Sequence, residues 1–342
     1  MNRVFVRGWG AVSPAGWGVS ALRSALNRNL PLPPGSISCP GSNHPLVARA
    51  VPVPSPRPAF LAHPRLRRTS PIAQYAAAAA LEALGSENGI PASLGLVLCV
   101  TSGCVRYSRR FYDETLKDPA TASPLVFPET VFNAPASHLA ALFGGNVLSY
   151  TLIGDQGTFL QALALAAEWL DTGHVENCLV VGAEEVDWLV AESLHLFSSQ
   201  AVVGEGAGAL HLSRLGGSGW VPEVAAITSP RLFTRNQSRG KAALRARAEL
   251  NNETANHLLC DGLQGIARLD RDEQVAWRDW KGHRLSPKRV CGEAFTAAAA
   301  WQCVAAVDAL ATGDFCGADV SVVGSNQQAI AARFVKPGTH SS

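Results

Sequence analysis

The chain has 342 residues, a formal net charge of +2, and 47% hydrophobic against 16% charged residues. This composition is ample for a large core and excludes disorder, and the small net charge gives no reason to expect a nucleic-acid partner. Residues 1–7 lack the apolar core of a signal peptide, and no apolar run looks long enough to cross a bilayer. We therefore expect a soluble, cytoplasmic protein with no membrane partner.

Eight cysteines are spread along the chain without a Cys-x-x-Cys pair or a metal-ligand spacing. Several stand in apolar runs, as Cys99 and Cys260 do. Buried free thiols in a reducing cytosol account for this pattern, so we expect no metal site and no disulfide framework.

The first third of the chain alternates short regular elements with a long irregular stretch. Residues 4–6 begin a strand, and residues 19–26 show a helical pattern. Residues 29–60 are rich in proline, serine and glycine and are predicted to be a loop excursion. A helix follows over residues 70–84, and the continuous apolar run Leu94–Val100 is typical of a buried parallel strand.

An internal repeat occupies the rest of the chain. Val147–Ile153 is predicted to be a strand, residues 158–170 an apolar helix, and residues 178–182 the next strand. The pattern recurs as a helix over residues 294–310 and a strand over residues 320–324. We interpret this as a duplicated strand–helix–strand half.

Two such halves, residues 1–215 and 216–336, predict a layered α/β sandwich, because each half must bury its strands on both faces. The helix over residues 158–170 is apolar nearly all round, which places it inside the protein. A side chain at its N-terminus would meet free backbone N–H groups and the positive end of the helix dipole.

Several motifs, in their order and spacing, resemble the β-ketoacyl synthase family over most of the chain. They are Gly-Trp-Gly-Ala-Val-Ser-Pro at 8–14, Phe-Pro at 127–128 with Asn133, Gly-Glu-Gly-Ala-Gly at 204–208, Lys288 with Gly292, and Gly-Ser-Asn at 324–326. The resemblance implies the thiolase fold, a five-layer αβαβα sandwich of two duplicated halves, and the acyl transfer of 3-oxoacyl-carrier-protein synthesis. It also implies structural roles for Glu205, Lys288 and Asn326.

The family's chemistry needs a cysteine at the mouth of the buried helix, where the dipole favours the thiolate that takes an acyl chain. Counting back from Ala162, Gln156 occupies that position in this chain. A glutamine has no titratable nucleophile and cannot carry an acyl thioester.

The two histidines that support the family's decarboxylation and stabilise the developing oxyanion also lack counterparts. Asp261 stands at the first position, in the stretch that leads to Asp270 and Glu273. For the second position, Glu293 precedes an alanine-rich helix, whereas the competing match His283 is followed by a segment that starts no smooth helix. We prefer Glu293.

The three departures together resemble the chain-length factors, or ketosynthase β subunits, of type II polyketide and aryl polyene synthases. The resemblance implies a heterodimer with a catalytic ketosynthase, formed through the strand Val147–Ile153. It also implies an acyl carrier protein as partner and no cofactor of the chain's own, since the acyl chain arrives on the carrier's phosphopantetheine. Phe132, Leu148 and Tyr150 would then lie at a shared tunnel or interface.

Three alternatives remain open at this stage. The chain could decarboxylate a malonyl carrier protein, a role in which relatives with this glutamine keep their histidines. It could be an active acyltransferase with an unusual nucleophile, for which Cys104 is the candidate beside a strand end. It could also be a scaffold without a tunnel role, which sequence does not separate from a chain-length factor.

Overall fold

The computed structural model describes residues 3–41, 45–85, 89–144, 146–216, 221–234, 237–250, 256–313 and 315–336. Two short 3₁₀ helices span Ala59–Ala62 and Phe127–Glu129. The other elements of the first half are β1 (Phe5–Ser13), β2 (Gly16–Trp17), α1 (Val19–Arg28), β3 (Gly35–Ile37), β4 (Leu46–Arg49), α2 (Pro71–Leu84), β5 (Leu94–Val100), α3 (Val105–Lys117), α4 (Ala134–Phe143), β6 (Val147–Ile153), α5 (Thr158–Asp171), β7 (Asn177–Glu184), α6 (Trp188–Phe197), β8 (Val203–Gly204) and β9 (Gly206–Ser213).

The second half repeats the same kinds of element with shorter connections. Its elements are β10 (Glu223–Ile227), β11 (Arg231–Leu232), α7 (Arg239–Glu249), β12 (His257–Cys260), α8 (Ala267–Ala276), β13 (Arg284–Leu285), α9 (Pro287–Cys291), α10 (Phe295–Thr312), β14 (Gly317–Val323) and β15 (Gln328–Val335).

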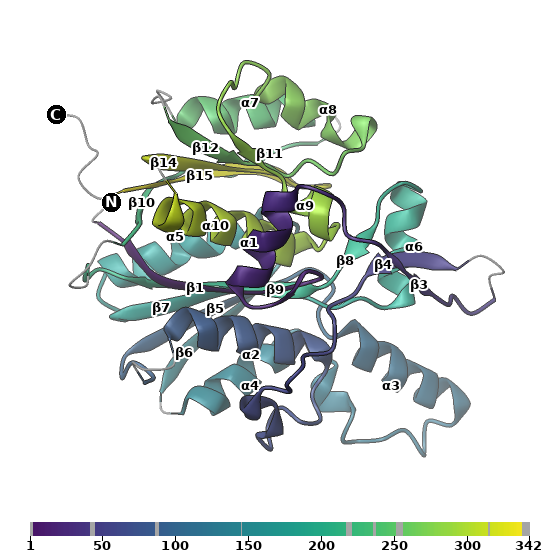
Figure 1. Ribbon diagram of the computed structural model, residues 1–342. Helices are drawn as coiled ribbons and strands as arrows, with labels where there is room; N and C mark the ends of the chain where they lie inside the picture. Colours follow the sequence, from purple (N-terminus) through teal and green to yellow (C-terminus); the bar gives the residue numbers. More distant parts are fainter. Residues whose placement is uncertain are drawn as a thin grey trace.

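The elements stack in five layers (Figure 1). Helices α7 and α8 cover the sheet of the second half, α5 and α10 lie between the two sheets, and α2 and α4 cover the sheet of the first half. The strands run in the order β13-β12-β14-β15-β10-β1-β9-β7-β5-β6, so the two sheets are continuous through the antiparallel pair of β1 and β10. The predicted five-layer αβαβα sandwich is confirmed.

The duplication is visible in strand direction. In the first half β6, β5 and β7 are parallel, and β9 and β1 follow antiparallel. In the second half β13, β12 and β14 are parallel, and β15 and β10 follow antiparallel. Strands β5 and β6 have their predicted bounds, and α5 and α10 begin at or beside the predicted residues.

Close approach of α10 to the first sheet explains the small residues of both. A Cβ added at Gly208 on β9 would lie 2.7 Å from the Cβ of Ala300, so glycine there lets the helix sit against the strand. Gly206 combines a φ of +145° with a hypothetical Cβ 2.2 Å from the carbonyl oxygen of Val12. The Gly-Glu-Gly-Ala-Gly motif is thus a packing requirement of the central layer.

The length and apolarity of α10 correct one expectation. This 18-residue helix is long and apolar enough to cross a membrane by composition alone, contrary to the sequence-based statement that no such run exists. Its most apolar window is 78% buried within the protein, between the two sheets. It is the core helix of the sandwich.

Residues 29–60 are more ordered than the predicted loop. Strands β3 and β4 pair antiparallel, and β4 joins β8 to make a separate small sheet. Leu46 and Ala48 of β4 are buried in a cluster with α6. Two alternating apolar residues in a proline-rich stretch are too weak a pattern to reveal a strand that is fixed by long-range pairing.

Candidate functional site

Gln156 lies at the N-terminus of α5 and is 1% exposed. Its side-chain oxygen accepts a hydrogen bond from the backbone N–H of Ser325 at 3.0 Å. Its amide nitrogen donates to Ser325 Oγ at 2.7 Å. Both ends of the amide are therefore occupied within the protein, and the position carries a hydrogen-bonded neutral group.

The neighbouring Asp155 connects the same helix to the turn that follows β14. Its Oδ1 accepts from the N–H of Gly157 at 3.1 Å, and its Oδ2 from the N–H groups of Gln327 and Gln328 at 3.2 and 3.3 Å. A Cβ at Gly324 would stand 1.9 Å from Oδ2. This buried carboxylate fixes the α5 entrance against the second half, and the sequence pattern did not single it out.

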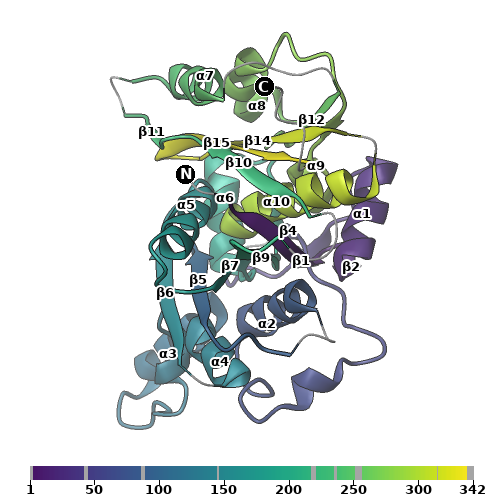
Figure 2. The same ribbon diagram turned by 90° about the vertical axis from the view of Figure 1, so that its left-hand side faces the viewer.

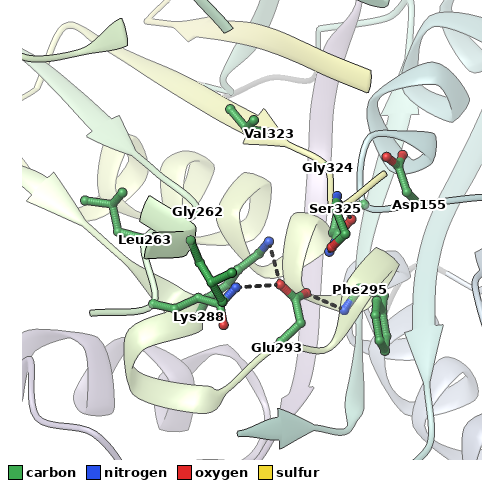
Figure 3. Close-up of polar contacts among 12 residues, drawn as sticks. Asp155, Gly262, Leu263, Lys288, Glu293, Phe295, Val323, Gly324 and Ser325 are labelled. Atoms are coloured by element: carbon green, nitrogen blue, oxygen red, sulfur yellow. Dashed lines mark hydrogen bonds and ion pairs between the residues drawn. The ribbon is translucent and has the colours of Figure 1, made fainter. Parts of the chain in front are cut away.

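Glu293 takes the corresponding place before α10. It is 1% exposed, its Oε2 lies 2.9 Å from Lys288 Nζ, and the Lys288 side chain is itself buried. Its Oε1 accepts from the N–H of Phe295 at 2.8 Å, and Gln264 Nε2 donates to Oε2 at 3.1 Å (Figure 3). The carboxylate is held by one cation, one amide and the favourable end of the α10 dipole.

A cavity of about 20 Å³ lies beside Glu293 and Ser325, and neither Gln156 nor Asp155 is among its lining residues. Its polar lining includes Gln264, Lys288, Glu293 and Ser325, and Leu194 and Phe197 of α6 close one side. A single water needs about 10 to 15 Å³ in such a measure. The space suits about one water molecule.

Asp261 does not join this group, although it was predicted to stand at the first histidine position. Its fully buried carboxylate accepts from Ser286 Oγ at 2.6 Å and pairs with Arg284 at 3.3 Å. Gln264 provides the side chain that contacts Glu293 instead. The one-residue slip before Asp270 made the sequence a poor guide to which residue faces the cavity.

Glu273 is a second buried acid close to Asp261. Burial, together with the neighbouring charge of Asp261, raises the pKa of Glu273 to about 7. Burial also raises the pKa of Asp261, against the opposing effects of Ser286 and Arg284. The N–H of Gly262 donates to Glu273 Oε1 at 3.1 Å, so this acid supports the loop that carries Gln264.

Two other candidates stand apart from the α5 entrance. Cys104 is buried, and burial raises the pKa of its thiol, an effect to which Glu185 and Glu129 add. His283 lies with its ring stacked on Phe315 at 5.8 Å between centroids, beside a different cavity. The raised pKa keeps the Cys104 thiol protonated, and a protonated thiol is a poor nucleophile.

The first half contains its own buried carboxylates. Glu205 accepts from the N–H groups of Val51 and Val186, at 3.1 and 3.0 Å, and from Tyr75 Oη at 3.0 Å, and it pairs with Arg106 at 2.8 Å. These contacts join the small sheet, α2 and α3. A similar carboxylate that sequence reasoning missed, Glu184, accepts from Thr296 Oγ1 of α10 at 2.8 Å.

Strand β6 ends its sheet, and no strand in the described ranges pairs with its outer side (Figure 2). Leu148 is 38% exposed and Tyr150 52% exposed, and Ile153 is also exposed. Phe132, likewise exposed, packs its ring against Gly103, which follows β5. Asn326 is exposed on the turn between β14 and β15.

Comparison with known proteins gives the fold a name. A family model described as 3-oxoacyl-[acyl-carrier-protein] synthase III matches residues 156–227, a segment that begins at Gln156 and includes α5. No curated protein matches the chain in sequence.

Solved structures match along almost the whole chain. The ishigamide ketosynthase/chain length factor has a TM-score of 0.79 at 19% identity, over 98% of this chain and 100% of that one. A β-ketoacyl synthase from Burkholderia phymatum STM815 has a TM-score of 0.78 at 17% identity, over 98% and 100%. A third structure is described as a type II polyketide synthase acyl-carrier protein in complex with its ketosynthase bound to the hexaketide. It has a TM-score of 0.77 at 19% identity, over 98% of this chain and 99% of that one. This chain has the thiolase-like ketosynthase fold.

Within the ketosynthase fold, the predicted site residues separate into three places. Gln156 and Glu293 stand at the mouths of the two central helices, with Lys288 beside the second. Asp261 and Glu205 belong to other buried polar networks and do not line the small cavity. Leu148 and Tyr150 are exposed on the edge strand β6, and Phe132 is exposed beside Gly103.

Proposed function

We propose that this chain is a non-condensing ketosynthase-like subunit, of the chain-length-factor type, that works beside a catalytic ketosynthase in polyketide, aryl polyene or fatty-acid-type chain elongation. The observation that carries the proposal is the α5 entrance. There Gln156 places a neutral amide, bonded at both ends to Ser325, where the chemistry of the fold requires a thiolate.

The groups around that entrance support the same reading. Glu293 Oε2 lies 2.9 Å from Lys288 Nζ, and both carboxylate oxygens accept hydrogen bonds within the protein, from Phe295 N–H and Gln264 Nε2. The cavity beside Glu293 and Ser325, of about 20 Å³, has room for about one water molecule. Malonyl decarboxylation at this site would need hydrogen-bond donors aimed at an enolate. Lys288 Nζ and Gln264 Nε2 both contact Glu293 instead, so we place this alternative behind the subunit role.

The proposed partner surface is the outer edge of β6. The outer side of β6, where Leu148, Tyr150 and Ile153 are exposed, offers main-chain hydrogen bonds and apolar contacts to a strand of another subunit. One of the matched solved structures is itself described as a ketosynthase/chain length factor. The acyl chain would be delivered on the phosphopantetheine of a carrier protein, with no cofactor held by this chain, in the cytoplasm.

Co-expression with a catalytic ketosynthase from the same genome tests the proposal. We expect one heterodimer in size-exclusion chromatography. The double variant Leu148→Lys/Tyr150→Lys should weaken the complex at least a hundredfold, because two buried ammonium groups would lack partners. The matched control is Leu232→Lys, an exposed leucine on β11. A chain that stays monomeric or forms only homodimers with the ketosynthase present would contradict the proposal.

Activity of the isolated chain provides a second test. Incubation with an acyl or malonyl carrier protein should leave the chain unacylated and release no carbon dioxide. Mass-spectrometric acylation at Cys104 would instead support the acyltransferase alternative. Carbon dioxide release that Gln156→Ala abolishes would support the decarboxylase alternative.

A further inference from the structure

A second cavity, of about 170 Å³, lies between α1 and α10. Its α10 residues run from Val304 to Thr312, in the C-terminal part of the helix. Asp308 is thirteen residues beyond Phe295, which corresponds to about 20 Å along an α-helix. The cavity is therefore separate from the α5 and α10 entrances.

The floor and one wall of this cavity are apolar and aromatic. Leu22 and Leu26 of α1 and Val304 of α10 are buried and face it. Phe315 and His283 line the wall as a stacked pair, with ring planes inclined by 25°. Rings pack well against other rings in offset or edge-to-face arrangements, so the Phe315–His283 pair favours an aromatic ligand over a bulky aliphatic one.

The polar lining comprises Asn27, Thr312, His283 and the ion pair of Arg23 with Asp308, and its one cationic group is the Arg23 guanidinium, which Asp308 holds in place. Asp308 accepts from Arg23 Nε at 2.6 Å and from Nη2 at 2.5 Å, and Trp9 Nε1 donates to the same carboxylate at 3.1 Å. The Arg23 side chain is 41% exposed and Asp308 is buried. Among the described residues no acceptor bonds Arg23 Nη1, so its N–H groups are available to a ligand.

We propose that this cavity binds a small neutral aromatic carbonyl compound, with one ring between α1 and α10 and its carbonyl oxygen on Arg23 Nη1. The size fits, since a cavity of about 150 Å³ in another protein accepts benzene. The buried carboxylate of Asp308 already balances the guanidinium, so an anionic ligand would lose its hydration without a net opposite charge in return. A neutral acceptor avoids that cost. This inference does not depend on the proposed subunit function.

Acetophenone, toluene and benzoate are the probes, titrated into the full-length chain and followed by protein NMR. Acetophenone should bind about tenfold more tightly than toluene, because a hydrogen bond to a charged donor is gained, and more tightly than benzoate. Arg23→Lys should reduce that preference for acetophenone to about twofold while toluene binding stays unchanged, since the lysine keeps the Asp308 pair and loses the second donor edge.

Filling the cavity gives an independent check. Ala305→Leu places three more carbons in the space and should abolish binding of all three probes, whereas Ala141→Leu, on the exposed face of α4, should leave binding unchanged. A crystal structure with acetophenone should show the ring between α1 and α10. Equal affinity for acetophenone and toluene, a ring bound elsewhere, or no binding at all would overturn the inference.

Discussion

The mouths of the two central helices occupy equivalent places in the duplicated fold but differ in chemistry. Gln156 and Glu293 each lie two residues before the first residue of their helix. The first is a neutral amide hydrogen-bonded across the halves to Ser325. The second is a carboxylate with its own lysine.

The difference shows what the fold does and does not decide. Duplication fixes a buried position with free N–H groups at the start of each helix. The residue placed there decides whether that position holds a nucleophile, an amide or an ion pair. Variants at each entrance test whether the two positions differ in this way.

Removing the cation at the α10 entrance should have the largest effect. Lys288→Met leaves Glu293 buried without its partner and should lower the free energy of unfolding by about 3 to 5 kcal/mol. The double variant Lys288→Met/Glu293→Gln should recover most of that loss in urea denaturation. Arg289→Met is the control, because the same charge is removed from an exposed site on the same short helix. A double variant no more stable than the single one would contradict the ion-pair account.

The buried carboxyl group of Glu273 should make the free energy of unfolding depend on pH. The raised pKa of Glu273, about 7 against 4.5, means that the folded protein keeps a proton which the unfolded chain releases. This stabilising contribution is complete below pH 4.5 and is lost as the pH rises through 7. Glu273→Gln should therefore gain up to about 3 kcal/mol relative to wild type between pH 5 and pH 8. If the unfolding free energies of wild type and Glu273→Gln change in parallel between pH 5 and pH 8, the raised pKa of Glu273 would be refuted.

The neutral entrance should respond more weakly. Ser325→Ala leaves the amide nitrogen of Gln156 buried without an acceptor and should cost about 1 to 3 kcal/mol. This loss should not change between pH 5 and pH 8, since neither group is charged. Ser193→Ala, at an exposed position on α6, serves as the matched control. A pH-dependent loss would show that the two entrances are coupled.

The smallest effect is expected at the edge of the first sheet. Leu148→Lys should change the free energy of unfolding of the isolated subunit by no more than about 0.5 kcal/mol, because the side chain is already exposed. Thermal denaturation of the free chain measures this. A loss above about 2 kcal/mol would mean that Leu148 belongs to the subunit's own core and would weaken its assignment to an interface.

Elements with strong local patterns could be predicted from the sequence. The apolar runs of β5 and β6, the helix α5 and the alanine-rich α10 were all evident, because burial on both faces leaves a continuous apolar signature. The hairpin of β3 and β4 was not, since its pairing with β8 is long-range. The position of Gln156 followed from counting along a helix.

The polar contacts of the site could be predicted only in part. Asp155, Gln264 and Glu184 act through partners far away in sequence, such as Gln328, Glu293 and Thr296. No local pattern marks such residues, because a buried carboxylate or amide is recognisable only by what surrounds it. Asp261 shows the converse, since its motif-like place in sequence gave no indication of the Arg284 contact.

The open strand β6 also bears on how the chain must be produced. The outer main-chain N–H and C=O groups of β6 are flanked by exposed apolar side chains. They can pair with any extended segment, including those of nascent or misfolded polypeptides. If the proposed partner covers that strand, a cell that makes this chain in excess of the partner should accumulate aggregates or degrade the surplus. Balanced synthesis of the two polypeptides would then be a requirement for yield as much as for activity.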